Sequence, residues 1–309
     1  MSTLEAHPPR EHAHGFRRVW LAIKNGVADL FNDDALMLAA AVSYFSALSL
    51  APLAVLAIWV FSMLGQGSQE SLVKQVESFA GSAGSDAFRM VLQNAEDRPR
   101  FGSWAGLVSV VTLLIGASAV FAQLQRALNT IFDVRPKKGG GAKASIFRLL
   151  RQRVLSMGML LVIFFLLVVS LIASAAVGFI TDLIPGPPWV WHVVNTLVTI
   201  VLFGLLFAAM FKLLPDVILR WKDVVRGGIV TAILFAIGKL GLGIYLAHAS
   251  VGSSYGAAGS LIVLLVWVYY SATILFLGAE FTQAWVLAGG HDLPPDSYAQ
   301  RRSTPGVGT

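Results

Sequence analysis

The sequence predicts an all-α integral membrane protein, a polytopic bundle of six transmembrane helices with its N- and C-termini in the cytoplasm. Three observations support this prediction. Of 309 residues, 56% are hydrophobic and 13% charged, whereas soluble domains are about 45–50% apolar and about 25% charged. The apolar residues form blocks longer than the roughly 20 residues needed to cross a bilayer. The lysines and arginines gather in alternate loops.

The N-terminal segment, residues 1–34, is expected to be a cytoplasmic tail. Residues 1–15 are polar and rich in His and Pro, and we expect them to be disordered. Over residues 16–31, apolar side chains recur at helical spacing, with Arg17, Arg18 and Lys24 between them. This pattern predicts a basic amphipathic helix in the membrane interface. The alternative is a helix packed on the cytoplasmic face of the protein itself.

A single membrane domain is expected over residues 35–287, because no polar segment is long enough to form a core of its own. The six predicted spans are 35–64, 102–122, 154–181, 191–214, 227–250 and 257–285. The first apolar block is too long for the h-region of a cleavable signal peptide, so we expect it to remain as a membrane helix. Residues 288–309 are expected to be a disordered cytoplasmic tail.

The orientation follows from the lysines and arginines. The segments assigned to the inner side hold 17 of them, and the outer segments hold four, all within residues 65–101. The positive-inside rule therefore places both termini in the cytoplasm. The formal net charge of +6 then indicates anionic lipid headgroups, not nucleic acid, as the partner. The oligomeric state is left open.

The first span carries a packing signal. Small residues recur at every fourth position, which allows another helix to approach closely: Ala35, Ala39, Ser43, Ala47 and Ala51. Pro52 follows this strip. Because proline removes a backbone donor and clashes with the preceding turn, we expect it to kink the span.

Catalytic motifs give little support to an enzyme. Cysteine is absent, and none of the six histidines lies in an HExxH or a comparable metal-binding pattern. The string GSSYG at residues 252–256 matches G-x-S-x-G, but it falls in a short loop between two predicted spans, not on a strand-to-helix elbow. Phosphate loops and dinucleotide fingerprints are missing. We therefore expect no cofactor, no metal and no catalytic residues.

Intramembrane polar residues form the candidate site. Lys239 lies near the middle of the fifth span, where a cation costs about 2.5–3.5 kcal/mol on insertion scales. It is therefore expected to have a partner or a function, and Glu280 in the sixth span is expected to share one buried network with it. The proposed crevice, open to the cytoplasm, comprises Lys239, Glu280, Tyr269, Thr273, Gln283, Gln123 and Arg126. The alternative is ordinary structural pairing at helix ends.

Four stretches carry a family resemblance. They are AAAVSYFSALSLAPL, GASAVFAQLQRALNTIFDV, LLPDVILRWKDVVRGG and YGAAGSLIVLLVWVYYSATILFLGAEFTQAW. In these stretches the sequence resembles the YihY/BrkB family of bacterial inner-membrane proteins, once labelled ribonuclease BN. The resemblance implies six spans, a bacterial inner membrane and roles in envelope or lipid physiology. It supplies no catalytic residues, and the residues themselves give the nuclease label no support.

The leading functional hypothesis is a transporter-like protein that handles a lipid or an amphipathic anion at its cytoplasmic face. The competing class is a non-catalytic membrane scaffold or envelope-assembly partner, and an enzyme is a distant third. A deep polar cavity that reaches Lys239 favours transport. Solid packing around Lys239 favours the scaffold.

Overall fold

The computed structural model describes residues 15–48, 119–137, 187–248 and 257–302, together with the single positions 73, 74, 85, 89 and 169. Helices dominate these residues, as the sequence predicts. The exception to an all-α fold is a small antiparallel ribbon, in which β1 (Val134–Pro136) pairs with β2 (Ala299–Arg301).

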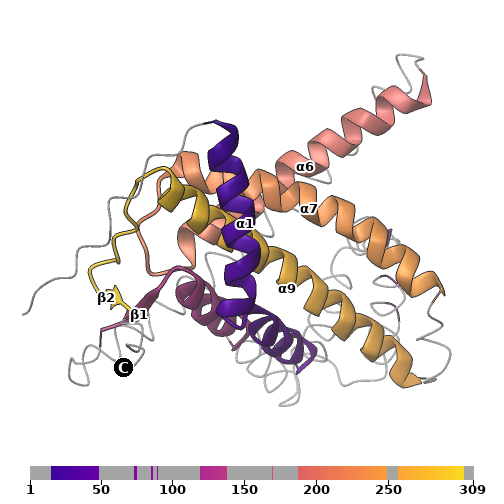
Figure 1. Ribbon diagram of the computed structural model, residues 1–309. Coiled ribbons are helices and arrows are strands. Elements are labelled where there is room, and N and C mark those ends of the chain that lie inside the picture. The colour runs from indigo at the N-terminus through magenta and orange to yellow at the C-terminus, as the bar shows by residue number, and fades with distance from the viewer. Residues whose placement is uncertain are drawn as a thin grey trace, which may run out of the picture.

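Three long helices form the centre of the molecule: α6 (Pro188–Leu213), α7 (Trp221–His248) and α9 (Ala257–Ala288). Each contains an apolar stretch of 25 to 27 residues, which is long enough to cross a membrane. They confirm three of the predicted spans as helices: 191–214, 227–250 and 257–285. The helix α7 packs against both α6 and α9 (Figure 1). The other three predicted spans lie mostly outside the described residues, so the count of six stays a prediction.

The contact between α7 and α9 depends on two glycines and two threonines. Thr231 of α7 occupies the space beside Gly278 of α9, and Thr282 of α9 occupies the space beside Gly227 of α7. The hydroxyl of each threonine donates to the carbonyl of the glycine four residues earlier on its own helix, at 2.7 Å for Thr231 and 2.6 Å for Thr282. This arrangement fixes the register of the two antiparallel helices.

A shorter apolar helix, Ala35–Leu48, carries the predicted strip of small residues. Ala35, Ala39 and Ser43 are buried, and the Ser43 hydroxyl donates to the Leu265 carbonyl of α9 at 2.8 Å. The close approach predicted from the strip is therefore confirmed for these residues. Ala51, the end of the strip, and the predicted kink at Pro52 lie outside the described residues.

A common apolar core joins this helix to a helix over residues 119–131 and to α6, α7 and α9. The fully buried Leu128, Ile131 and Phe211 lie at its centre. Further along α6 and α7, the stacked rings of Phe203 and Phe235 lie with their centroids 5.1 Å apart. The core is thus continuous between segments that are far apart in the sequence.

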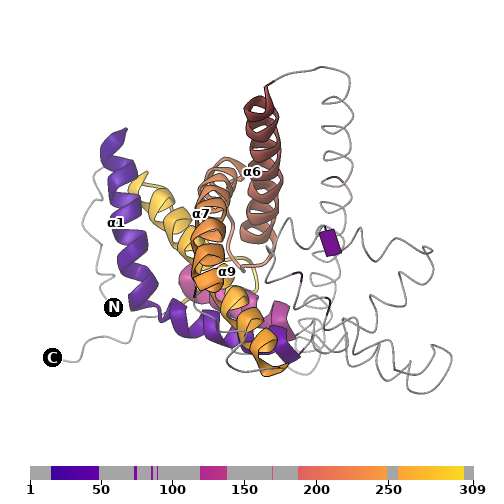
Figure 2. The same cartoon turned by 90° about the vertical axis from the view of Figure 1, so that its right-hand side faces the viewer.

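The predicted amphipathic helix is present as α1 (Phe16–Asn32). It packs against the C-terminal half of α9 through Ala22 and Gly26. Figure 2 shows α1 and α6 on opposite sides of α7 and α9. At the end of α1, Asp34 adopts a left-handed backbone conformation with φ of 53°, which aspartate tolerates better than most residues. The helix Ala35–Leu48 then leaves in a new direction.

Residues 132–137, 214–220 and 289–302 meet at one end of the bundle, and we call them the cap. Here the prediction of a disordered tail over residues 288–309 is wrong for residues 289–302. The Ile218 amide donates to the Pro294 carbonyl at 2.9 Å, and the Arg302 amide donates to the Asp133 carbonyl at 2.8 Å. The tail is ordered because its backbone groups pair with those of β1 and of the loop 214–220.

Candidate functional site

The Glu280 carboxylate is the most unusual group in the described part of the protein. Its residue is fully buried, and neither of its carboxylate oxygens has a hydrogen-bond donor among the described residues. An ionised carboxylate without such donors is costly to bury. Glu280 therefore needs either a charge partner or a bound proton.

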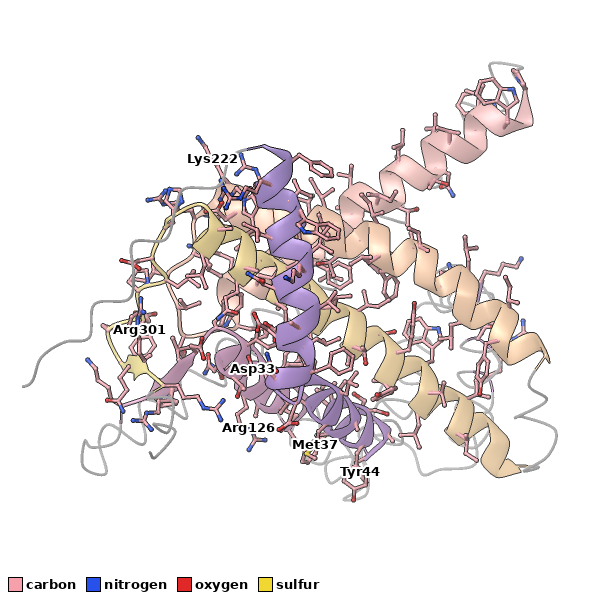
Figure 3. The ribbon with its side chains drawn as sticks, in the orientation of Figure 1. Asp33, Met37, Tyr44, Arg126, Lys222 and Arg301 are labelled. Carbon is pink, nitrogen blue, oxygen red and sulfur yellow. The ribbon has the colours of Figure 1, made fainter. Side chains whose placement is uncertain are left out.

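Three more carboxylates surround Glu280 and act on it electrostatically: Asp29, Asp33 and Asp133. Asp29 lies in α1, Asp33 follows the end of α1, and Asp133 follows the helix 119–131. Figure 3 shows Asp33 at the junction between α1 and the next helix. We call these four residues the carboxylate cluster.

Local structure explains how the cluster forms. Asp29 and Asp33 are four residues apart, so they lie on one side of the helical path, the side on which Gly26 also lies. Asp133 ends its helix in a left-handed conformation with φ of 53°. Its carboxylate accepts a hydrogen bond of 3.1 Å from Gln283 Nε2. Because Gln283 is one turn after Glu280 on α9, this bond holds Asp133 close to Glu280.

Burial alters the acidity of the two aspartates outside the membrane-spanning segments. Burial raises the pKa of Asp33 to about 6, and the negative charges of Asp133 and Asp29 add to this effect. Burial also raises the pKa of Asp133, while the hydrogen bond from Gln283 and the charge of Arg302 act in the opposite direction. The cluster is thus able to exchange protons close to neutral pH. In the described part of the chain, no group of three or more such side chains is placed to hold a metal ion.

The helix α1 covers this region of α9. Arg18 Nη2 and Nε donate to the Trp285 carbonyl at 2.8 and 3.2 Å, and the guanidinium lies 4.1 Å from the centre of the Trp285 ring. A cation at the C-terminal end of a helix is favourable. At the other contact, Gly26 lies directly against the backbone of Phe281. The two contacts hold α1 across residues 281–285, next to Glu280.

A second polar group, centred on Asp216, is fully hydrogen-bonded. Asn129 Nδ2 donates to Asp216 Oδ2 at 2.9 Å, Gln125 Nε2 donates to Oδ1 at 3.2 Å, and the Asp216 amide donates to Asn129 Oδ1 at 2.7 Å. These bonds fix the loop 214–220 to the helix 119–131. Because its donors and acceptors are satisfied, we assign this group a structural role.

Lys239 and Glu280 are not brought together. Gly238, the neighbour of Lys239, faces the Tyr270 hydroxyl. Glu280 is ten residues beyond Tyr270 on α9, which is about 15 Å along a helix. Direct contact between Lys239 and Glu280 is therefore not seen, and the predicted network through a bridging water or side chain stays a prediction.

The remaining predicted crevice residues are also dispersed. The Thr273 hydroxyl donates to the Tyr269 carbonyl on its own helix at 2.9 Å. Gln123 is buried, while Arg126 is exposed. Of the other predicted crevice residues, Gln283 contacts the carboxylate cluster, through its hydrogen bond to Asp133. Sequence reasoning missed Asp29 and Asp133, although the four-residue spacing from Asp29 to Asp33 was a usable signal.

The cap contains a pocket of about 290 Å³. Its polar lining residues are Arg220, Asp223, His291 and Asp292, and its lining includes neither Lys239 nor Glu280. This pocket is therefore not a deep polar cavity that reaches Lys239, which is the feature that would favour transport.

Comparison with known proteins identifies a family and relatives that the chain resembles. Residues 27–299 match the family described as Virulence factor BrkB. A UPF0761 membrane protein from Ralstonia nicotianae is 25% identical over 89% of this chain and 59% of its own length. Another from Methylibium petroleiphilum is 29% identical over 84% of this chain and 61% of its own length.

The chain thus spans about three fifths of the length of these curated relatives. No solved structure matches it. The family match covers most of the sequence, and three of the described helices are apolar and long enough to cross a bilayer. The chain belongs to the Virulence factor BrkB family of membrane proteins.

Proposed function

We propose that this protein is a transporter-like protein of the bacterial inner membrane that handles a lipid or an amphipathic anion at the cytoplasmic face. The observation that carries the proposal is the position of α1. This helix exposes an apolar face while it packs over the buried carboxylate of Glu280, which has no hydrogen-bond donor among the described residues.

The helix α1 has three distinct faces. One face packs on α9 through Ala22 and Gly26. A second face exposes large apolar side chains, with 84% of Phe16 and 58% of Trp20 accessible. These are Phe16, Val19, Trp20, Ile23, Val27 and Phe31. Because water is a poor environment for such a stripe, the hydrocarbon boundary of a bilayer is its natural surroundings.

The third face is polar and exposes Arg17 and Lys24. Basic residues beside an apolar stripe suit anionic headgroups. An amphipathic anion would meet these cations on the face of α1 that points away from α9. The carboxylate cluster lies on the face packed against α9, where it repels anions. The same helix thus presents a lipid-compatible surface and covers a group able to change its charge.

The orientation in this proposal rests on charge. The 17 basic residues predicted on the inner side include those of α1 and of the cap, against four on the outer side. We therefore place the cap, α1 and both termini in the cytoplasm, in a bundle of six spans.

A membrane scaffold is the second candidate. The packing of α7 against α9 supports it, because the paired glycines and threonines leave no space between the helices at that contact. A scaffold role, however, does not explain why the Glu280 carboxylate is buried without a hydrogen-bond donor among the described residues. We therefore rank transport first.

Reconstitution in liposomes tests the proposal through lipid-scrambling and anion-flux assays. The variant Val27→Glu places one negative charge on the apolar face of α1, and Ala28→Glu places the same charge on the adjacent polar face. Activity in the wild type that is lost in Val27→Glu and kept in Ala28→Glu supports the proposal. Folded wild-type protein that neither scrambles lipid nor conducts an anion favours the scaffold.

A further inference from the structure

We propose that Glu280 is a proton-binding site, and that α1 closes over the site when the proton is bound. The reaction is the addition of one proton from the adjacent aqueous phase to one carboxylate oxygen. It changes the side chain from a charge of −1 to neutral. No other reactant is needed.

The first support is burial without hydrogen-bond donors. Glu280 is fully buried, and both oxygens lack a donor among the described residues. Gln283, one turn away, donates to Asp133 instead. An ionised carboxylate in this position keeps the full cost of desolvation, whereas a neutral carboxylic acid avoids most of it. Binding a proton is the simplest way to remove the charge.

The second support is the sign of the surrounding charges. Among the described residues, the groups that act electrostatically on Glu280 are acidic: Asp33, Asp29 and Asp133. They come from α1, from the junction after α1 and from the end of the helix 119–131, so the acidic surroundings involve several elements. Asp34 adds a further negative charge beside Asp33. Negative charges close to a carboxyl group oppose its ionisation, so these aspartates favour the protonated form of Glu280.

The arginines near the carboxylate cluster interact with its aspartates. Arg302 acts on Asp33 and Asp133, and Arg301 acts on Asp133. Neither is among the groups that act on Glu280. Lys239 of α7 lies near the level of Tyr270, which is about three helical turns from Glu280 along α9. A proton is therefore the counter-ion that fits Glu280, since the described carboxylates are not arranged to hold a metal ion.

The third support is the way in which α1 covers the site. A Cβ atom at Gly26 would lie 3.3 Å from the carbonyl carbon of Glu280 and 3.0 Å from the nitrogen of Phe281. Asp29 and Asp33 follow Gly26 along the same side. Ionisation of Glu280 places a negative charge beneath these two carboxylates, so repulsion acts on the C-terminal half of α1. Arg18 holds the N-terminal half at Trp285.

This proton site goes beyond the proposed function and does not depend on it. A protein that moves no lipid still binds the proton, and a transporter is possible without this site. A negative result in the liposome assays therefore contradicts the proposed function alone, and a negative result in the measurements below contradicts the proton site alone.

Infrared difference spectroscopy of the full chain in lipid nanodiscs tests the bound proton. We expect a carboxylic acid C=O band at pH 7 in the wild type. This band should be absent in Glu280→Gln, which keeps the size of the side chain, and present in Asp292→Asn, which changes an exposed carboxylate. Wild-type and Glu280→Gln spectra without a difference in this region at pH 7 would overturn the proposal.

Cysteine labelling tests the closure of α1, since the chain has no native cysteine. Leu30→Cys replaces a buried residue of α1, and Asn32→Cys replaces an exposed one close by. The two thiols differ in their own pH dependence because one is buried and the other exposed, so the ratio of their labelling rates is compared between the wild-type and Glu280→Gln backgrounds. We expect this ratio to rise several-fold more from pH 6 to pH 9 in the wild-type background than in the Glu280→Gln background. A flat ratio in both backgrounds, or an equal rise in both, would exclude the coupling.

Discussion

The backbone of Gly26 in α1 lies directly against the backbone of Phe281 in α9, and little room remains for a side chain at position 26. A Cβ atom at Gly26 would lie 3.0 Å from the Phe281 nitrogen and 3.1 Å from its Cα. Because Glu280 precedes Phe281, this crossing lies at the edge of the carboxylate cluster. Glycine at position 26 therefore allows α1 to cover Glu280.

Gly26→Leu should separate α1 from α9. Overpacking of this kind costs about 1–3 kcal/mol, and here it can be relieved by displacement of α1. We expect faster amide hydrogen exchange in α1 and a lower Tm in the same detergent. Ala28→Leu, on an exposed face, is the matched control. Equal exchange in the two variants would show that the Gly26 contact does not hold α1.

Gly278→Ala should destabilise the α7 and α9 pair. The new methyl group would overlap the Thr231 side chain, and the expected loss is about 1–3 kcal/mol in the free energy of unfolding. Adding Thr231→Ala should recover part of the loss, because it removes two of the three overlapping atoms. Gly241→Ala meets no described atom within 4 Å and should be harmless. Losses that simply add in the double variant would argue against this register.

Asp216→Ala should loosen the cap. It leaves the side-chain amides of the buried Asn129 and the part-buried Gln125 without their acceptor, at about 1–3 kcal/mol for an unsatisfied buried group. We expect rapid proteolysis in the loop 214–220 and a lower Tm. Asp292→Ala removes an exposed ion pair with Arg301 and should have little effect. Similar proteolysis patterns for both variants would contradict the role assigned to Asp216.

Stability should depend on pH through Asp33. Its pKa in the folded protein is raised to about 6 from an ordinary value of 3.8, so the folded state binds this proton more tightly than the unfolded state. The contribution of Asp33 to stability therefore falls as pH rises from about 4 to about 6, and the loss persists at pH 7. The raised pKa of Asp133 acts with the same sign.

Asp33→Asn should therefore raise the Tm at pH 7 and flatten the Tm profile between pH 4 and 6. Asp292→Asn provides the control for loss of a surface charge. A Tm for Asp33→Asn below that of the wild type at pH 7, with an unchanged profile, would mean that Asp33 is not the group that titrates.

The long helices and the small-residue strip could be predicted from the sequence because their signals are local. Apolar blocks of membrane length and alanines at every fourth position need no knowledge of distant contacts. Ser43 shows the value of the strip, because its predicted close approach is realised at the Leu265 carbonyl. The ordered tail could not be predicted, since β2 has three residues and no periodicity can be recognised over that length.

The candidate site was predicted only in part for a related reason. The sequence selected Glu280 and Gln283 as buried polar residues, but their neighbour Asp133 is 150 residues away from Gln283. The short loop between their helices predicts that Lys239 and Glu280 belong to one network, bridged by a water or by another side chain. The register, in which Thr231 lies beside Gly278, places Lys239 near Tyr270. Such steric matches are not visible in composition or spacing.

We propose that α1 lies in the membrane interface with one face on α9 and another in lipid. Spin labels at positions 22 to 25, 27 and 28 of the reconstituted protein test this position directly, through their relaxation by oxygen and by a water-soluble nickel complex. We predict immobilisation at residue 22, oxygen access at 23 and 27, and nickel access at 24 and 28, while position 26 stays unlabelled because a side chain there would meet the backbone of Phe281. Nickel access at 23 and 27 equal to that at 24 and 28 would contradict the interfacial position of α1.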